Sequence, residues 1–215
     1  MTSHSATTLL LVLDGWGYSE SPDSNAIHHA ETPVWDRFWR DQPHTLISGS
    51  GPDVGLPSGQ MGNSEVGHMN LGAGRVLFQD LTRIDSAVRS GSITQNKALN
   101  DAIDAAAGTR LHLIGLLSAG GVHSHEDHFA AVIEHAASRG SEIVVHALLD
   151  GRDTPPQSAH DSLMRIEAQL TALGAGRIGT VCGRYFGMDR DARWERVRSA
   201  FDAMVHGQAE FTAPD

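Results

Sequence analysis

The sequence predicts an α/β fold built around a parallel sheet. Three apolar stretches, 111–117, 143–149 and 178–181, are each followed by a turn and then by a longer segment with helical periodicity. Repeated β-α units are typical of parallel sheets with right-handed crossovers, because a parallel neighbour is reached only by a connection that crosses the sheet. A further apolar run at 9–13 is predicted to be a strand buried on both faces.

The first 80 residues contain less regular structure. The run 9–13 ends in the turn Asp-Gly-Trp-Gly, so Asp14 is expected at the carboxyl end of this strand. Residues 33–40 are predicted to form a short helix that begins at Pro33. Residues 48–75 are so rich in glycine that we expect mostly loop and one helix start. Something other than core packing has to explain this glycine-rich stretch.

Regular alternation of strands and helices begins near residue 79. We therefore predict two domains, 1–78 and 79–215. The helices of the second domain are expected at 126–139, 158–173 and 190–205. The first two of these are followed by glycine, the residue most common just after the last helical turn.

Composition restricts the class of function. Lys and Arg number 16 against 26 for Asp and Glu, and the formal net charge of −10 disfavours broad binding to nucleic acid or anionic membranes. An anionic substrate must then meet a local cluster of Arg and His. The only cysteine, Cys182, excludes an internal disulfide and suits a reducing compartment. The run 9–13 is too short to cross a bilayer, so we expect no membrane anchor and no signal peptide.

Polar residues follow each strand of the three β-α units. Because the carboxyl ends of parallel strands meet at one edge of a sheet, we expect these residues to form an anion-binding pocket. For any one of them a helix cap or a surface ion pair is an equally good explanation, and only the common placement in three units favours a site. They are His123 after the first strand, Arg152 and Asp153 after the second, and Arg184 and Arg190 after the third.

The run 59–75 carries the strongest chemical signal. Ser64 follows a glycine and an asparagine, and helical residues begin by Val66, so Ser64 is expected at a helix N-terminus, where backbone N–H groups and the helix dipole favour phosphate. A serine hydroxyl becomes a nucleophile at neutral pH only beside a base or a metal ion. The alternative is that Ser64 only caps this helix, with Glu65 as a favourable acidic residue in the first turn.

A second pattern supports a different hypothesis. It has the spacing His-x-His-x-Asp-His, which resembles the zinc-binding loop of metallo-β-lactamase-type hydrolases. The residues are His123, His125, Asp127 and His128. A zinc hydrolase leaves the Asp-Gly-Trp-Gly turn and the serine run without a role, and the later histidines fall in predicted helices or strands.

Taken together, these segments resemble the cofactor-independent phosphoglycerate mutases, which interconvert 3-phosphoglycerate and 2-phosphoglycerate. The matches follow the family's order over nearly all of the chain, and the run Met-Gly-Asn-Ser-Glu-Val-Gly-His is highly specific to it. The matching segments are 13–17, 25–27, 54–57, 60–75, 79–83, 115–128, 149–156 and 183–197.

The resemblance implies a fold, a metal site and a set of substrate contacts. The fold would be an alkaline-phosphatase-like domain with an inserted α/β transferase domain, both incomplete in this chain. By position, Asp14 and Ser64 look like ligands of one of two divalent metal ions, which the family suggests are Mn²⁺. The implied contacts to a phosphoglycerate substrate are His123, Arg152, Asp153, Arg184 and Arg190.

The mechanism implied by the resemblance has two displacements. Metal-activated Ser64 takes the phosphoryl group as phosphoserine, and the glycerate that is released shifts and takes the group back on its other hydroxyl. Asp153 is the natural acid and base for the glycerate hydroxyls. Closure of the two domains should keep glycerate from escaping. We also expect a cytoplasmic location and a monomer at full length.

The sequence departs from this family in length, because members are well over twice as long as its 215 residues. In the longer family members, most of the metal ligands and further phosphate contacts lie in the region that this sequence does not include. Asp14 and Ser64 alone would hold a divalent ion weakly. We therefore expect the chain by itself to be inactive, and a non-catalytic truncated remnant is the alternative to a mutase. Residues 1–78 would then expose apolar surface intended for absent strands.

Overall fold

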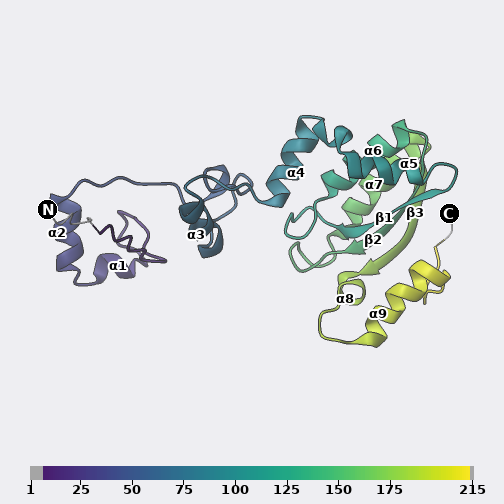
Figure 1. Ribbon diagram of the computed structural model, residues 1–215. Helices are drawn as coiled ribbons and strands as arrows, with labels where there is room; N and C mark the ends of the chain where they lie inside the picture. Colours follow the sequence, from purple (N-terminus) through teal and green to yellow (C-terminus); the bar gives the residue numbers. More distant parts are fainter. Residues whose placement is uncertain (1–6, 214–215) are drawn as a thin grey trace. The chain divides into compact units, whose positions relative to one another are not determined.

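The computed structural model describes residues 7–213, which fall into two compact units, one ending at Gln79 and the other beginning at Asp80. The first unit consists of short helices joined by loops, and the second is a three-stranded sheet with helices packed against it (Figure 1). No helix among the described residues is both long and apolar enough to span a membrane.

The helices of the first unit are short. They are α1 (Ala26–His29), α2 (Pro33–Asp41), the 3-10 helix η1 (Gly51–Val54) and α3 (Ser64–Ala73). The predicted helix at 33–40 is confirmed as α2. A small core forms where Val54, Leu56 and Val66 are buried together. The side chain of Asn70 donates to the backbone of Val54 and accepts from the backbone of Leu77, which fixes the chain after α3.

The predicted strand at 9–13 is wrong. These residues have no regular secondary structure, and the side chains from Leu9 to Leu13 are 41% to 83% exposed. A strand of this composition needs neighbours that pair its backbone and cover both apolar faces. Within residues 7–79 no second strand is present to do so. Asp14 still lies in a turn, which is closed by a hydrogen bond from the Trp16 amide to the Leu13 carbonyl.

The second unit contains the three predicted β-α units. Its strands are β1 (Arg110–Leu117), β2 (Glu142–Leu149) and β3 (Gly176–Gly183), in the order β1-β2-β3 with both pairs parallel. The helices between them are α6 (Glu126–Ser138) and α7 (Ala159–Leu173). The α/β class and the parallel sheet are therefore confirmed.

Further helices flank the sheet. Two that the sequence did not indicate to us, α4 (Asp80–Arg89) and α5 (Lys97–Ala105), precede it, with the 3-10 helix η2 (Ser92–Gln95) between them. The helix expected at 190–205 is divided. Residues 190–193 are not helical, and the remainder falls in α9 (Trp194–Phe201) and the π-helical turn η3 (Asp202–His206). The short helix α8 (Arg184–Gly187) comes before them.

The core of the second unit lies between the sheet and the helices α6 and α7. Ile133, Ile143, Val145 and Ile166 are fully buried there. Burial of one such side chain stabilises the fold by about 1.5–3 kcal/mol. β3 begins against β2 only because Gly176 has no side chain, since a Cβ at this position would lie 1.9 Å from the Ile143 carbonyl oxygen.

A line of polar side chains crosses the other face of the sheet. The His112 Nδ1 lies 2.8 Å from the His146 Nε2, and the His146 Nδ1 lies 2.9 Å from the Thr180 hydroxyl. His146 is only 5% exposed. Burial, followed by the nearby His112, lowers the pKa of His146 below its ordinary value.

This burial predicts a pH-dependent stability. Because the pKa of His146 is lower in the folded chain than in the unfolded chain, protonation favours unfolding, and stability should fall as pH drops below the ordinary histidine pKa of about 6.5. Urea unfolding between about pH 5 and pH 7 measures this slope. We expect a shallower slope in His146→Gln and an unchanged slope in His160→Gln, an exposed control. Equal slopes in the parent and His146→Gln would contradict the prediction.

Candidate functional site

Helix α3 begins at Ser64, as the sequence predicted, but Ser64 is not its cap. The side chain of Asn63 accepts a hydrogen bond from the Val66 amide at 2.9 Å, which is the contact expected of an N-cap. The interpretation of Ser64 as a simple helix cap is therefore wrong. Its hydroxyl remains available for other contacts.

The Ser64 hydroxyl lies between a carboxylate and an imidazole. It donates to the Asp14 Oδ2 at 2.8 Å, and the His68 Nδ1 lies 3.1 Å from the same oxygen. The His68 Nδ1 is also 2.8 Å from the Ser64 carbonyl oxygen. Since a carbonyl only accepts, this nitrogen carries the proton and donates to both oxygens. The hydroxyl thus has an acceptor for its proton and a donor for negative charge on its oxygen.

The surroundings of Ser64 keep it accessible. Ser64, Asp14 and His68 are all exposed. Just before the cap, a Cβ at Gly62 would lie 1.7 Å from the Gly49 carbonyl oxygen, so the close approach of these two backbone segments requires glycine. The serine is held at a helix start where its oxygen can meet a ligand.

The metal-binding capacity of this group is partial. Asp14 and Ser64 present oxygen atoms, the donor type that hard divalent cations prefer. Among residues 7–213, however, no three His, Cys, Asp or Glu side chains are arranged to hold a metal ion. The donor chemistry fits a divalent cation, and the described residues supply fewer ligands than such an ion requires.

The residues predicted at the carboxyl edge of the sheet come together in part. The Arg184 Nη1 donates to the Asp153 Oδ2 at 2.6 Å and to the Asp150 Oδ1 at 2.8 Å. The His123 Nε2 lies 4.0 Å from the Asp153 Oδ2. β1, β2 and β3 therefore each contribute a polar side chain to one cluster.

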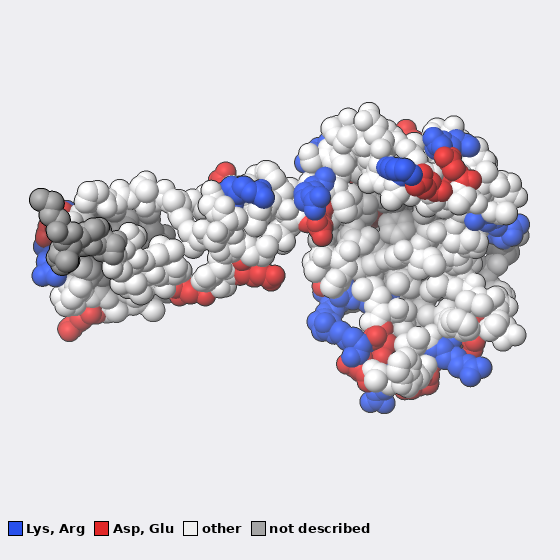
Figure 2. All heavy atoms as spheres, viewed as in Figure 1, with Lys and Arg blue, Asp and Glu red and all other residues white. Residues whose placement is uncertain are grey.

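Arg152 and Arg190 are placed differently. Both are exposed, and neither side chain forms an ion pair with a carboxylate in the part of the chain that the structure describes. Elsewhere in the second unit, basic and acidic side chains lie next to one another (Figure 2). Arg165, for example, forms ion pairs with Glu126 and Asp127. Arg152 and Arg190 therefore keep charge that an anion could use.

Asp150 sets the charge of this cluster. Its burial would raise its pKa, but hydrogen bonds from Ser118, from the amides of Arg152 and Asp153 and from Arg184 outweigh burial and hold the pKa well below its usual range. Asp153 raises the pKa of Arg184, against an opposing effect of burial, and Asp150 adds to the rise. Both groups are charged at neutral pH.

Sequence reasoning missed three residues of these clusters. His68 lies four residues after Ser64, which places both on one helix face, so the spacing alone could have indicated it. Ser118 and Asp150 directly follow β1 and β2, the same positional signal that pointed to Arg152 and Arg184. Their burial and mutual contact could not be seen in the sequence.

The alternative zinc site is not formed. His125 accepts a hydrogen bond from the Asp127 amide and caps α6, while the His128 Nε2 lies 2.6 Å from the Asp85 Oδ1. His123 is directed to Asp153 instead. The His123 and His128 side chains have partners outside the motif, because α6 begins inside it and turns successive residues to different sides. The zinc hydrolase hypothesis is therefore wrong for this structure.

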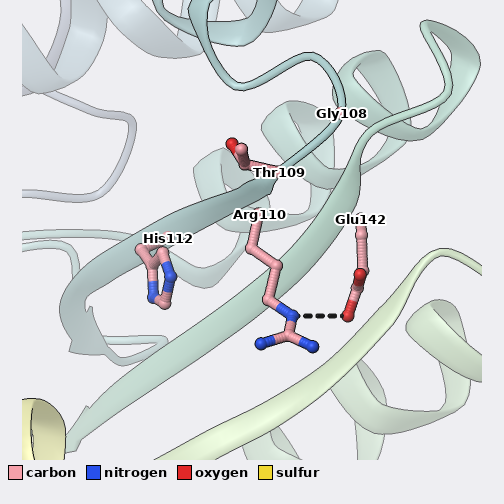
Figure 3. Close-up of a pocket in the computed structure, with 5 residues that line it drawn as sticks. All are labelled: Gly108, Thr109, Arg110, His112 and Glu142. Atoms are coloured by element: carbon pink, nitrogen blue, oxygen red, sulfur yellow. Dashed lines mark hydrogen bonds and ion pairs between the residues drawn. The ribbon is translucent and has the colours of Figure 1, made fainter.

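A pocket of about 410 Å³ lies at the opposite edge of the sheet (Figure 3). It is lined by Gly108, Thr109, Arg110, His112 and Glu142, and the Arg110 Nε donates to the Glu142 Oε1 at 2.8 Å. These residues lie where β1 and β2 begin, whereas the predicted site residues follow their carboxyl ends. No residue predicted from the sequence lines this pocket.

Comparison with known proteins assigns the family. The family model described as BPG-independent PGAM N-terminus matches residues 84–215. The chain belongs to this family.

Alignments of nearly the whole chain with individual relatives extend the sequence similarity to both units. The 2,3-bisphosphoglycerate-independent phosphoglycerate mutase of Pseudomonas aeruginosa (strain PAO1) is 58% identical over 99% of this chain and 42% of its own length. That of Yersinia pestis is 55% identical with the same coverage. A crystal structure of Leishmania mexicana phosphoglycerate mutase at low cobalt concentration matches with a TM-score of 0.66 and 42% identity, over 92% of this chain and 38% of that one.

The start of α3 allows a direct test of the capping assignment. In Asn63→Ala the Val66 amide loses its acceptor, so we expect a loss of about 0.5–2 kcal/mol in helix stability. Hydrogen exchange of the Val66 amide should become several-fold faster. Ser64→Ala is the matched control and should leave this amide unchanged. Faster exchange in Ser64→Ala alone would restore Ser64 as the cap.

Proposed function

We propose that this chain supplies the nucleophile and part of the substrate pocket of a phosphoglycerate mutase that interconverts 3-phosphoglycerate and 2-phosphoglycerate. The observation that carries the proposal is the Ser64 hydroxyl, exposed at the start of α3 and hydrogen-bonded to Asp14 and His68. The chain spans about 42% of the length of the curated relatives it matches, so the activity of the whole protein is inferred here from family and site together.

Ser64 serves as the temporary carrier of the phosphoryl group. A bond forms between its oxygen and phosphorus while the bond from phosphorus to the substrate oxygen breaks, leaving phosphoserine and glycerate. The proton of Ser64 faces the Asp14 carboxylate, and His68 donates to the same oxygen. In the second step the other hydroxyl of glycerate attacks phosphorus, and Ser64 becomes the leaving group and regains a proton.

The second unit binds the substrate in this proposal. Arg152, Arg184 and Arg190 offer positive charge to the phosphate and carboxylate groups of phosphoglycerate. His123 adds a further contact. Asp153, between His123 and Arg184, gives a proton to the departing glycerate oxygen and removes one from the attacking hydroxyl. The first unit then corresponds to the phosphatase-like domain and the second to the transferase domain.

Two divalent ions complete the proposed site. Asp14 and Ser64 would hold one of them together with ligands that the described residues do not supply. When bound, such ions stabilise negative charge on the serine oxygen and the transferring phosphoryl group. We propose Mn²⁺ on the family resemblance alone, since oxygen donors also suit other hard divalent ions. We further propose a cytoplasmic monomer.

The proposal is tested on the complete product of the gene. Ser64→Ala should abolish transfer of labelled phosphate from 3-phosphoglycerate to the protein, because no other side chain replaces the lost oxygen. Ser48→Ala, an exposed serine in the same unit, is the matched control and should keep the label. Circular dichroism checks that both variants fold. Label that persists on Ser64→Ala would refute the phosphoserine step.

The 215-residue chain alone should form no 2-phosphoglycerate from 3-phosphoglycerate in the presence of Mn²⁺. Asp14 and Ser64 by themselves bind a divalent ion weakly, and the apolar side chains from Leu9 to Leu13 are left exposed. A coupled assay for 2-phosphoglycerate measures this. Turnover by the purified chain would overturn the expectation.

A further inference from the structure

The Asp150 carboxylate belongs to the cluster at the carboxyl ends of the strands, but the proposed mechanism gives it no role. Its side chain is only 2% exposed. Its Oδ1 accepts from the amides of Gly151, Arg152 and Asp153 at 2.9–3.0 Å and from the Arg184 Nη1 at 2.8 Å. Its Oδ2 accepts from the Ser118 hydroxyl at 2.6 Å. Both oxygens are occupied by the protein itself, so a substrate has no access to them.

This carboxylate connects the ends of all three strands. Ser118 follows β1, Asp150 follows β2, and Arg184 follows β3. The Ser118 hydroxyl also accepts from the Gly120 amide at 2.9 Å, which brings in the loop after β1. A Cβ at Gly120 would lie 3.2 Å from the Asp153 carbonyl oxygen, so the first two loops are closely packed. One buried charge therefore connects the loops after β1 and β2 with the start of α8.

The arrangement of Arg184 depends on this charge. Its Nη1 is shared between Asp150 and Asp153, and its other N–H groups form no hydrogen bond with the residues that the structure describes. Without the Asp150 charge, Asp153 would be the only carboxylate holding the guanidinium, and the amides of 151–153 would face a neutral, weaker acceptor. Arg152, whose amide is one of the three, would be held less firmly.

We propose that Asp150 is a positioning residue for substrate binding, which holds Arg184 and the loop 151–153 in the arrangement that receives the phosphoglycerate anion. Asp150 does not contact the substrate. This inference rests on the proposed function and extends it to a buried residue that acts through Arg184. Ser118 supports Asp150 from the neighbouring strand.

Steady-state kinetics of the complete protein test the inference. Asp150→Asn keeps the shape of the side chain and removes its charge, and we expect the KM for 3-phosphoglycerate to rise about tenfold or more, since hydrogen bonds to charged groups are the strong ones. kcat should change much less. Asp85→Asn, which removes a carboxylate paired with His128 in the same unit, is the control and should leave KM within about twofold.

A double-mutant cycle separates positioning from general destabilisation. If Asp150 acts mainly through Arg184, Asp150→Asn should raise KM several-fold less when Arg184→Ala is already present, and the remaining effect is that of the loop 151–153. A purely structural role would give the same loss in both backgrounds. Ser118→Ala is a milder variant that removes one hydrogen bond, and its KM should rise about threefold. This variant decides the matter if Asp150→Asn does not fold.

The outcomes distinguish the inference from the proposed function. If the wild-type protein is active and Asp150→Asn has an unchanged KM, the inference is overturned and the proposed function stays intact. The same holds if Asp150→Asn and Arg184→Ala change KM independently of each other. A wild-type protein that neither binds nor converts phosphoglycerate would overturn both. The inference is supported if Asp150→Asn raises KM in the wild-type background and raises it much less in the Arg184→Ala background.

Discussion

Parallel pairing of β1, β2 and β3 is the constraint on which the candidate substrate site depends. Parallel strands end at the same edge, so residues that follow them in sequence become neighbours in space. Ser118, Asp150 and Arg184 are separated by more than thirty residues at each step, yet they share hydrogen bonds. Burial of apolar side chains under α6 and α7 keeps the register that makes this possible.

Charge in the second unit is then distributed by local pairing. Several acidic and basic side chains form ion pairs at the surface, such as Arg110 with Glu142 and Arg139 with Asp104, and such exposed pairs add little stability. After the strands the balance differs, because Asp150 and Asp153 share one guanidinium while Arg152 and Arg190 form no ion pair with a carboxylate within residues 7–213. An acidic protein can thereby offer a local site for an anion.

The serine in the first unit depends on short-range interactions. The cap from Asn63 begins α3, a glycine permits two backbone segments to meet, and His68 returns to Ser64 along one turn of helix. Only Asp14 comes from a distant part of the chain. A site formed largely by local contacts can be recognised in the sequence. The motif around Ser64 was accordingly the strongest indication of the family.

The sequence by itself determined the β-α units, the helix start at Ser64 and the membership of a mutase family, because periodicity, glycine positions and a dense motif are local properties. It did not determine that 9–13 stays exposed, since a strand needs partners that apolar composition cannot guarantee. It also did not reveal the surroundings of Asp150, which accepts hydrogen bonds from five donors in two loops and at the start of α8. Only the tertiary structure decided these points, because hydrogen bonding between distant segments and burial exist only once the chain is folded.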